Sequence, residues 1–123
     1  MKTTHRILGA IWMTVLAFGL AASCSKKATA SFEQRMAAGQ VVMDQREQNK
    51  LMADLAKDAA DVGNASIVSQ ALGRIADEGL RNDIEEACAL KLAKAGKQTE
   101  ALQVAKMITS QAQQNSVLSK LAK

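Results

Sequence analysis

The sequence has few of the residues that usually carry enzymatic chemistry. Its 123 residues include no proline or tyrosine, one histidine, one tryptophan, two phenylalanines and two cysteines. His5 and Trp12 both lie in an N-terminal segment that has the pattern of a signal peptide, so the processed chain is expected to lack them. A catalyst needs a base that titrates near neutrality, an activated nucleophile or a set of metal ligands. We therefore predict that the protein is not an enzyme, has no catalytic residue and binds no cofactor.

The scarcity of histidine and cysteine also limits metal binding. Cys88 is the only thiol besides Cys24, so zinc sites built from cysteine and histidine are excluded by count. The carboxylates of Glu85 and Glu86 could in principle bind a hard cation, but adjacent residues of a helix point in different directions. A solvated charged surface is the preferred interpretation, and we predict no metal site.

Basic residues exceed acidic ones only slightly. The sequence has 16 Lys and Arg against 12 Asp and Glu, a formal net charge of +4 and a pI of about 9.3. Loss of residues 1–23 would remove Lys2 and Arg6 and leave 14 basic against 12 acidic residues, a net charge of about +2. The chain has no basic tract with interleaved aromatic residues, so nucleic acid is not an expected partner.

The N-terminus has the pattern of a secretory signal. Lys2, His5 and Arg6 precede an apolar run from Ile7 to Ala22, which is expected to form a signal helix. This run, residues 7 to 22, contains 16 residues, fewer than the roughly 18 that identify a membrane-spanning helix. Cleavage is the preferred interpretation, and an uncleaved membrane anchor is the alternative.

The apolar run ends in Leu-Ala-Ala-Ser-Cys at residues 20–24, which resembles a bacterial lipobox. The resemblance implies that Cys24 carries a diacylglycerol on its sulfur, that cleavage frees its amine and that this amine is usually acylated as well. Two or three acyl chains anchor a protein stably, at roughly 0.8 kcal/mol per buried CH₂, whereas one chain binds only marginally. Ala28-Thr29-Ala30 would suit an ordinary signal peptidase, but two lysines separate it from the apolar run.

These features divide the chain into three parts. We expect a lipoprotein signal peptide at 1–23, a lipidated N-terminus and short linker at 24–30, and a helical domain at 31–123. The last part is rich in Ala, Leu, Gln and Lys and poor in β-branched residues, which favours helices throughout.

Residues 31–123 resemble themselves when the sequence is shifted along its own length. The best shift places 31–63 over 64–96, and 97–123 forms a truncated third copy. Apolar, small and glycine positions agree between the copies: Val42/Ile75/Ile108, Leu51/Ile84/Val117, Leu55/Cys88/Leu121, Ala56/Ala89/Ala122 and Gly63/Gly96. These matches predict a repeat of about 33 residues, with two helices in each copy. Because Cys88 is equivalent to two leucines, we expect it to be a small buried residue.

Glycines and capping residues predict where the helices end and begin. Gly63 and Gly96 follow apolar runs and suit helix-ending positions with positive φ. Three strong N-cap types recur at the repeat spacing: Asp44, Asp77 and Ser110. The first and third have capping-box partners in Glu47 and Gln113, whereas Asp77 has none.

An alternative takes Asn49, Asn82 and Asn115 as the N-caps, with Glu85 as the capping-box partner of Asn82. Two boxes against one favour the Asp/Asp/Ser set, so these asparagines are expected inside helices. The resulting helices are 32–43, 45–62, 65–76, 78–95, 98–109 and 111–122.

Leu55-Ala56 before Gly63 and Cys88-Ala89 before Gly96 resemble the tetratricopeptide repeat, in which a large residue and a small one precede a helix-ending glycine. The resemblance covers 45–123, with 31–44 matching the second half of a unit. It implies an all-α fold of tandem antiparallel helical hairpins, a short α-solenoid. It also implies a partner-binding groove lined by the first helix of each hairpin. The matching positions are Lys50, Ala53, Lys57, Asp83, Glu86 and Leu90.

The lipobox and the helical repeat together predict an envelope lipoprotein that acts as a small protein–protein interaction module at a membrane surface. The membrane is contacted through the lipid on Cys24, and the protein partner is unidentified. Ser25 after the cysteine favours the outer membrane facing the periplasm, while Lys26 and Lys27 leave the inner membrane open.

The alternative function is structural, a lipoprotein that links membrane and cell wall. The chain is similar to the murein lipoproteins in its Cys24-Ser25 start and its final Lys123. Those proteins form one unbroken coiled coil, whereas glycine inside a helix costs roughly 0.5–1 kcal/mol relative to alanine. Four glycines would interrupt such a seam here: Gly63, Gly73, Gly79 and Gly96.

The last expected helix is polar on most of its surface, as the end of a helical array should be. Val117, Leu118 and Leu121 are spaced for one inward face. We therefore expect the domain at 31–123 to be a monomer that associates with a different protein. The alternative is that a second copy of the chain completes its core.

Overall fold

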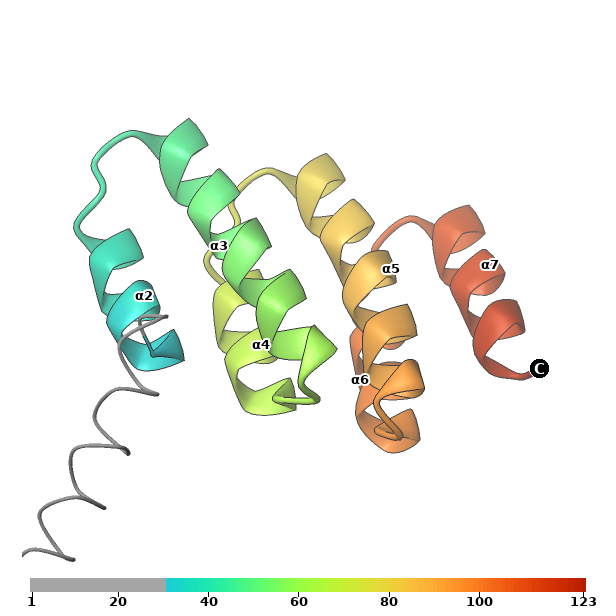
Figure 1. Cartoon of the computed structure of the whole chain (residues 1–123). Helices are drawn as coiled ribbons and strands as arrows, with labels where there is room; N and C mark the ends of the chain where they lie inside the picture. The colour runs from blue at the N-terminus through green and yellow to red at the C-terminus, as the bar shows by residue number, and fades with distance from the viewer. Residues whose placement is uncertain (1–30) are drawn as a thin grey trace, which may run out of the picture. The chain divides into compact units, whose positions relative to one another are not determined.

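Six α-helices make up residues 31–123, the part of the chain that the computed structural model describes, and this part contains no β-strand (Figure 1). The helices are α2 (Phe32–Gln40), α3 (Gln45–Asp61), α4 (Ala65–Leu72), α5 (Glu78–Lys94), α6 (Gln98–Met107) and α7 (Gln111–Leu121). The predicted all-α class is confirmed for these residues. The signal peptide at 1–23, the linker at 24–30 and Cys24 lie outside the described residues.

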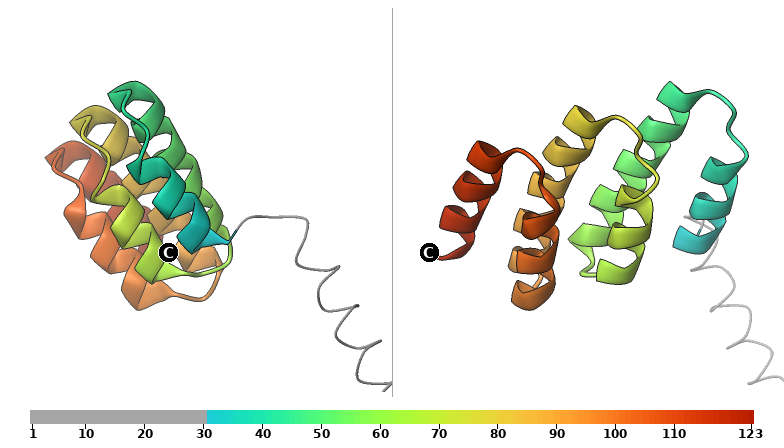
Figure 2. Two further views of the ribbon diagram at one scale, coloured as in Figure 1. Left: turned by 90° about the vertical axis from the view of Figure 1, so that its left-hand side faces the viewer. Right: turned by 180° about the vertical axis from the view of Figure 1, so that it is seen from behind.

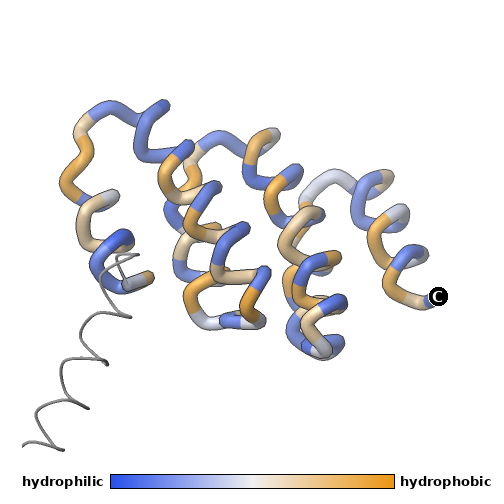
Figure 3. The backbone as a smooth tube through the Cα atoms, in the orientation of Figure 1, coloured by the Kyte–Doolittle hydropathy of each residue, from blue (hydrophilic) through white to orange (hydrophobic). Residues whose placement is uncertain are grey.

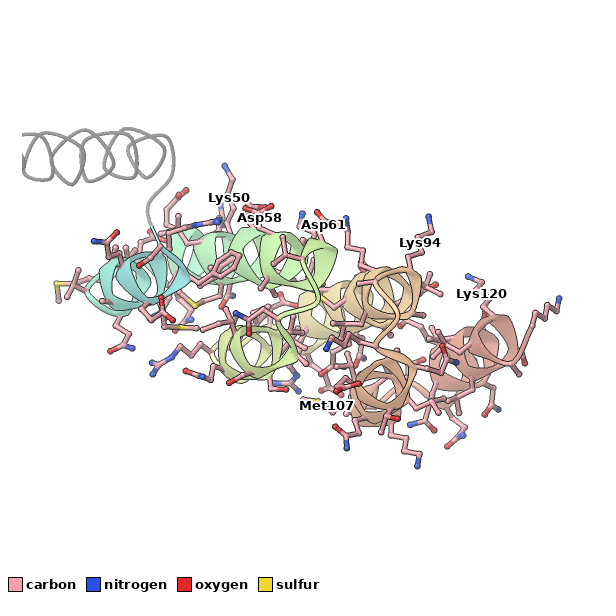
Figure 4. All side chains as sticks on the ribbon, turned by 60° about the horizontal axis from the view of Figure 1, so that its bottom comes forward. Lys50, Asp58, Asp61, Lys94, Met107 and Lys120 are labelled. Carbon is pink, nitrogen blue, oxygen red and sulfur yellow. The ribbon has the colours of Figure 1, made fainter. Side chains whose placement is uncertain are left out.

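The helices are arranged in two layers. α3, α5 and α7 lie side by side in the first layer, and α4 and α6 lie in the second (Figures 1 and 4). α4 contacts α3 and α5, α6 contacts α5 and α7, and α2 contacts α3. Seen from behind, α2 and α7 lie at opposite ends of the row (Figure 2). The chain thus advances along the row, and each helix contacts helices close to it in sequence.

Glycine turns join α3 to α4 and α5 to α6. Gly63 and Gly96 have φ values of 75° and 81°, which a residue with a Cβ rarely adopts. Each glycine N–H donates to the carbonyl three residues back, at 3.1 Å, and the following N–H donates to the carbonyl five residues back, at 2.9 Å. This is the hydrogen-bond pattern of a Schellman motif. The predicted role of both glycines is confirmed.

Aspartates begin α3 and α5, as the sequence predicts. Oδ1 of Asp44 accepts hydrogen bonds from the N–H groups of Arg46 (2.9 Å) and Glu47 (3.0 Å). Oδ1 of Asp77 accepts one from the N–H of Leu80 (2.8 Å). These bonds satisfy N–H groups that have no partner within the helix.

The capping box predicted at the start of α7 is wrong. Ser110 occupies the N-cap position but makes no side-chain capping hydrogen bond. Its expected partner, Gln113, directs its amide to the carboxylates of Asp83 and Glu86 on α5. A tertiary contact has replaced the local one.

Helices α2, α4 and α6 end earlier than predicted, and α4 and α6 do so because an isoleucine after each of them is needed in the core. Ile75 and Ile108 follow α4 and α6 with only 1% and 3% of their surface exposed. Ile108 has an extended backbone (φ −61°, ψ 121°), which turns its side chain inward. The carbonyls of these two residues accept hydrogen bonds from Arg81 Nη1 (3.3 Å) and Gln114 Nε2 (3.2 Å).

Small side chains are buried on both α3 and α5, which contact each other. Ala56 and Ala89, which occupy equivalent positions in the predicted repeat, are fully buried. Leu55 and Cys88, the residues before them, are 1% and 0% exposed. The burial predicted for Cys88 is confirmed. Alanines at such positions let helices approach closely but supply little apolar area for each residue buried.

Candidate functional site

The predicted groove positions on α3 do not share one environment. Lys50 is exposed, and Lys57 is partly exposed and pairs with Asp54 (Nζ–Oδ1 3.3 Å). Ala53 is buried, with 5% of its surface exposed. The helix therefore presents two lysines to a partner, and its third predicted position belongs to the core.

The predicted positions on α5 are engaged in packing. Gln113 Nε2 of α7 donates to Asp83 Oδ1 (3.2 Å) and Glu86 Oε2 (2.9 Å), and Lys120 Nζ pairs with Glu86 Oε1 (3.0 Å). The hydrogen bond from Gln113, followed by that from Lys120, lowers the pKa of Glu86 from its ordinary value. Leu90 is half-buried and packs against the core. Asp83 and Glu86 thus fix α7 on α5.

A row of charged side chains follows the outer side of the first layer, and we call it the charged ridge. Figure 4 shows Lys50, Asp58, Asp61, Lys94 and Lys120 on this side of the molecule, and Met107 of α6 on the opposite side. Ion pairs and helical spacing add three more residues. The complete ridge is Lys50, Asp54, Lys57, Asp58, Asp61, Lys91, Lys94 and Lys120. All three acidic members lie on α3, whereas the members on α5 and α7 are lysines.

Ion pairs link the ridge to neighbouring helices without removing its charges from water. Lys91 of α5 pairs with Asp61 of α3, and Arg35 of α2 pairs with Asp58 at 2.8 Å. The Asp58 and Asp61 side chains are each 53% exposed. Exposed pairs of this kind contribute about 0–1 kcal/mol each. The ridge therefore presents a mixed-charge surface to a partner.

Two buried asparagines hold the loops that lead into α5 and α7. Asn49 and Asn82 lie within α3 and α5, with 8% and 7% of their surface exposed. Asn49 Oδ1 accepts a hydrogen bond from the N–H of Ala76 (3.0 Å), and Asn82 Oδ1 accepts one from the N–H of Thr109 (3.0 Å). Asn82 Nδ2 also donates to Thr109 Oγ1 (3.0 Å). In both cases the acceptor and the donor are separated by the same stretch of chain, so the two bonds are equivalent.

The prediction that the asparagines lie inside helices is confirmed, but the sequence did not reveal what they bind. The signal was present in the spacing of three asparagines at 49, 82 and 115. That spacing predicts equivalent positions but gives no sign of a bond to the backbone of a distant loop. We call each bond from a loop N–H to one of these side chains an asparagine rung.

Glu85 is a buried charge that the sequence analysis treated as a solvated one. It is 1% exposed, its Oε2 has no hydrogen-bond partner, and Arg81 Nε lies 3.9 Å from Oε1. Burial raises the pKa of Glu85, and the charge of Arg81 opposes that rise in part. In the predicted repeat the residues equivalent to Glu85 are Met52 and Leu118, so the sequence did contain a sign that this position faces the core.

The remaining reactive group is also enclosed. Cys88 is fully buried, and burial raises the pKa of its thiol to about 12, so the nucleophilic thiolate is disfavoured. Residues 31–123 contain no cluster of three or more histidine, cysteine or acidic side chains that could hold a metal ion. None of the helices α2–α7 is long and apolar enough to cross a membrane.

The comparisons with known proteins add no relative. No protein-family model, curated protein or solved structure matches this chain.

Proposed function

We propose that this chain is a bacterial envelope lipoprotein whose residues 31–123 form a short α-solenoid with a repeat of about 33 residues. Contacts at equivalent positions support the repeat. The asparagine rungs, the glycine turns and the bonds from Arg81 and Gln114 to the preceding loop carbonyls each recur from one copy to the next. Repeated contacts between neighbouring units are what build a solenoid.

The domain acts as a protein–protein interaction module, and the observation that carries this proposal is the charged ridge. Stacked first-layer helices give a rigid, extended surface, which is how repeat proteins usually bind partners. Among the described residues, Lys50 and Lys94 are the ridge lysines that make no ion pair, so a partner with acidic side chains opposite these two lysines fits the ridge best. Opposed charges of this kind mainly set the orientation and rate of binding.

The lipid anchor is proposed from the sequence alone. Cys24 carries the acyl chains and holds the domain at the envelope, with the outer membrane facing the periplasm as the preferred site and the inner membrane as the other. The structural alternative, a coiled coil between membrane and cell wall, requires one long helix. The described helices are between 8 and 17 residues long, which favours the interaction module.

Site-specific photo-crosslinking in intact cells tests the module. A photoreactive residue at Lys50 or Lys94, on the ridge, should give a discrete adduct with one protein. The same residue at the exposed Met107, on the opposite side, is the matched control and should give none. Adducts of equal yield from both sides, or none from either, would contradict the proposal.

Mass spectrometry of the processed protein tests the anchor. The expected mature chain begins at Cys24 and carries added acyl mass, and Cys24→Ala should leave the precursor unprocessed. A free N-terminus at Ser31 would contradict lipidation. Lys123 joined to peptidoglycan would support the structural alternative instead.

A further inference from the structure

The first end of the helix row exposes three apolar residues, and the residues equivalent to one of them, Leu51, are buried. Leu51 is 42% exposed, whereas Ile84 and Val117, at the same position in the later copies, are 8% and 0% exposed. The loop between α2 and α3 adds Val41 and Met43, which are 77% and 99% exposed. Figure 3 shows this loop as an apolar stretch at the α2 end of the row. We call Val41, Met43 and Leu51 the leading edge.

The other end of the row shows the reverse pattern. Asn115 of α7 is exposed, whereas the equivalent Asn49 and Asn82 are 8% and 7% exposed. Ala122 is exposed, whereas the equivalent Ala56 and Ala89 are fully buried. Leu118 is half-buried, although Met52 in the same position is fully buried. We call Asn115, Leu118 and Ala122 the trailing edge.

Asn115, on the trailing edge, could accept the hydrogen bond of a third asparagine rung, but no loop N–H of the described residues donates to it. Gln45 Nε2 donates to Asn49 Oδ1 (3.0 Å), and Asn49 also receives the N–H of Ala76. Gln111 Nε2 donates to Asn115 Oδ1 (3.2 Å), so the same glutamine contact already orients this third asparagine. The described residues supply no loop N–H to Asn115.

The leading edge carries the matching donor. Met43 occupies in the first copy the position that Ala76 and Thr109 occupy in the later ones, and the N–H groups of those two residues complete the other rungs. Within residues 31–123, the Met43 N–H has no hydrogen-bond acceptor. Asn115 therefore has the acceptor, and Met43 the donor, that one further rung would need.

The order of the helices allows the two edges to meet. α3 is followed along the row by α4 and α5, and α5 is followed by α6 and α7. If α7 is followed by α2 and α3 of a second copy, the alternation of the two layers continues unbroken. Residue 32 of the second copy then takes the place that residues 65 and 98 occupy within the chain.

Polar residues at this junction are also complementary. Between α5 and α7, Gln113 and Lys120 donate to the carboxylates of Asp83 and Glu86. At the junction, the equivalents of the carboxylates are Ser116 and Ser119, and the equivalents of the two donors are Glu47 and Asp54. Donors and acceptors have exchanged sides, so serine hydroxyls face carboxylates and like charges do not meet.

From these matches we propose that copies of this chain associate head to tail, with α7 of one copy packed against α2 and α3 of the next. This inference rests on the repeat proposed above and is independent of the lipid anchor, and Asp54 is the residue that its junction shares with the charged ridge. The sequence favours a polar cap and a monomer, and the equivalences between the two edges favour the alternative of a second copy. Because such a contact is heterologous and does not close, association continues beyond the dimer.

Sedimentation velocity of residues 31–123, which contain every buried apolar residue of the described core, tests the proposal. The wild-type sedimentation coefficient should rise with concentration past that of a dimer. Asn115→Lys should block the trailing edge and Leu51→Lys the leading edge, and each should weaken association at least tenfold, roughly 1.4 kcal/mol. Both residues are exposed, so thermal unfolding of the dilute variants should match the wild type.

Mixing the two variants tests the head-to-tail geometry itself. The Asn115→Lys chain keeps its leading edge and the Leu51→Lys chain keeps its trailing edge, so an equimolar mixture should form a one-to-one dimer and stop there. Ala37→Lys and Ala112→Lys are matched controls, because both positions are exposed in all three copies, and they should associate as the wild type does.

Three results would overturn the proposal. They are a wild-type domain that stays monomeric up to about 1 mM, variants that associate as strongly as the wild type, and a mixture that forms no dimer. None of these results alters the crosslinking expected at the ridge, so this proposal and the interaction module can fail separately.

Discussion

Two kinds of connection alternate along residues 45–121. The turns after α3 and α5 are closed by backbone hydrogen bonds around Gly63 and Gly96, all between residues close together in the chain. The loops before α5 and α7 are instead held by Asn49 and Asn82, each bonded to a backbone N–H in a loop beyond the next helix. The glycine turn is therefore a local structure that joins two helices into a pair. The asparagine rung is a tertiary contact that sets which pair follows which.

The largest expected loss of stability comes from disturbing the packing within and between helix pairs. Ala56→Leu and Ala89→Leu each add three carbons at a fully buried position, so each should lower the free energy of unfolding by about 1–3 kcal/mol. Urea denaturation of residues 31–123 measures this. The control is Ala122→Leu at the equivalent exposed position, which should change stability little. If both buried substitutions were neutral, the assigned register would be wrong.

Breaking an asparagine rung should lower the free energy of unfolding somewhat less than the two alanine substitutions do. Asn82→Ala removes the acceptor of the Thr109 N–H and the donor to its hydroxyl, and two such bonds are worth about 1–2 kcal/mol together. Chemical denaturation should show this loss, together with faster proteolysis in the loop at 108–110. Asn115→Ala, at the equivalent position where no loop N–H is bonded among the described residues, is the control and should change the stability of the dilute domain little. Equal effects at the two sites would remove the distinction between the two kinds of connection.

Straining a glycine turn should cost about 1 kcal/mol, because a Cβ disfavours the left-handed region. Gly96→Ala isolates this backbone effect, since an added Cβ would meet no atom within 4 Å. Gly73 has an ordinary helical φ of −63°, so Gly73→Ala should be neutral or slightly stabilising. Thermal unfolding of the pair measures the difference. A neutral Gly96→Ala would show that the turn does not depend on positive φ.

The smallest expected effect is a gain in stability, and it follows from a difference between α3 and α5. Glu85 occupies the position that Met52 fills in α3, and its buried Oε2 is unpaired. Glu85→Met should therefore stabilise the domain at pH 7, by up to about 1 kcal/mol. The arginine that neighbours it, Arg81, keeps its bond to the Ile75 carbonyl.

The gain from Glu85→Met should depend on pH in a defined direction. Burial raises the folded-state pKa of Glu85 above its ordinary value of 4.5, so the folded protein takes up this proton more readily than the unfolded chain. The loss of stability caused by the buried ionised carboxylate is fully present above the folded-state pKa. It disappears as pH falls from there through the ordinary value of 4.5. The stability difference between variant and wild type should narrow accordingly in denaturation at decreasing pH. A difference that widened on acidification would contradict the assignment.

Local signals predicted much of this fold. The glycine turns and the caps at Asp44 and Asp77 depend on residues within one turn of helix, and the sequence placed them correctly. The ends of α4 and α6 were predicted too late because Ile75 and Ile108 leave the helix to fill the core. That choice depends on neighbours far away in sequence. The capping box predicted for Ser110 and Gln113 is wrong for the same reason, because Gln113 binds carboxylates on another helix in place of its local partner.

The candidate site was less predictable than the fold. The groove positions came from resemblance to a family, and the structure buries Ala53 and commits Glu86 to α7. The charged ridge depends on how far successive helices rotate and on which side chains pair across them. The asparagine spacing was visible in the sequence, but its bonding partners required coordinates.

Amide hydrogen exchange of the dilute domain, followed residue by residue by NMR, tests the central claim most directly. Three backbone N–H groups occupy the same position in successive copies of the proposed repeat: Met43, Ala76 and Thr109. The account predicts that Ala76 and Thr109 exchange slowly, that Met43 exchanges freely, and that Asn82→Ala releases Thr109 while Ala76 stays protected. Exchange of Thr109 as fast as that of Met43 in the wild type would contradict it.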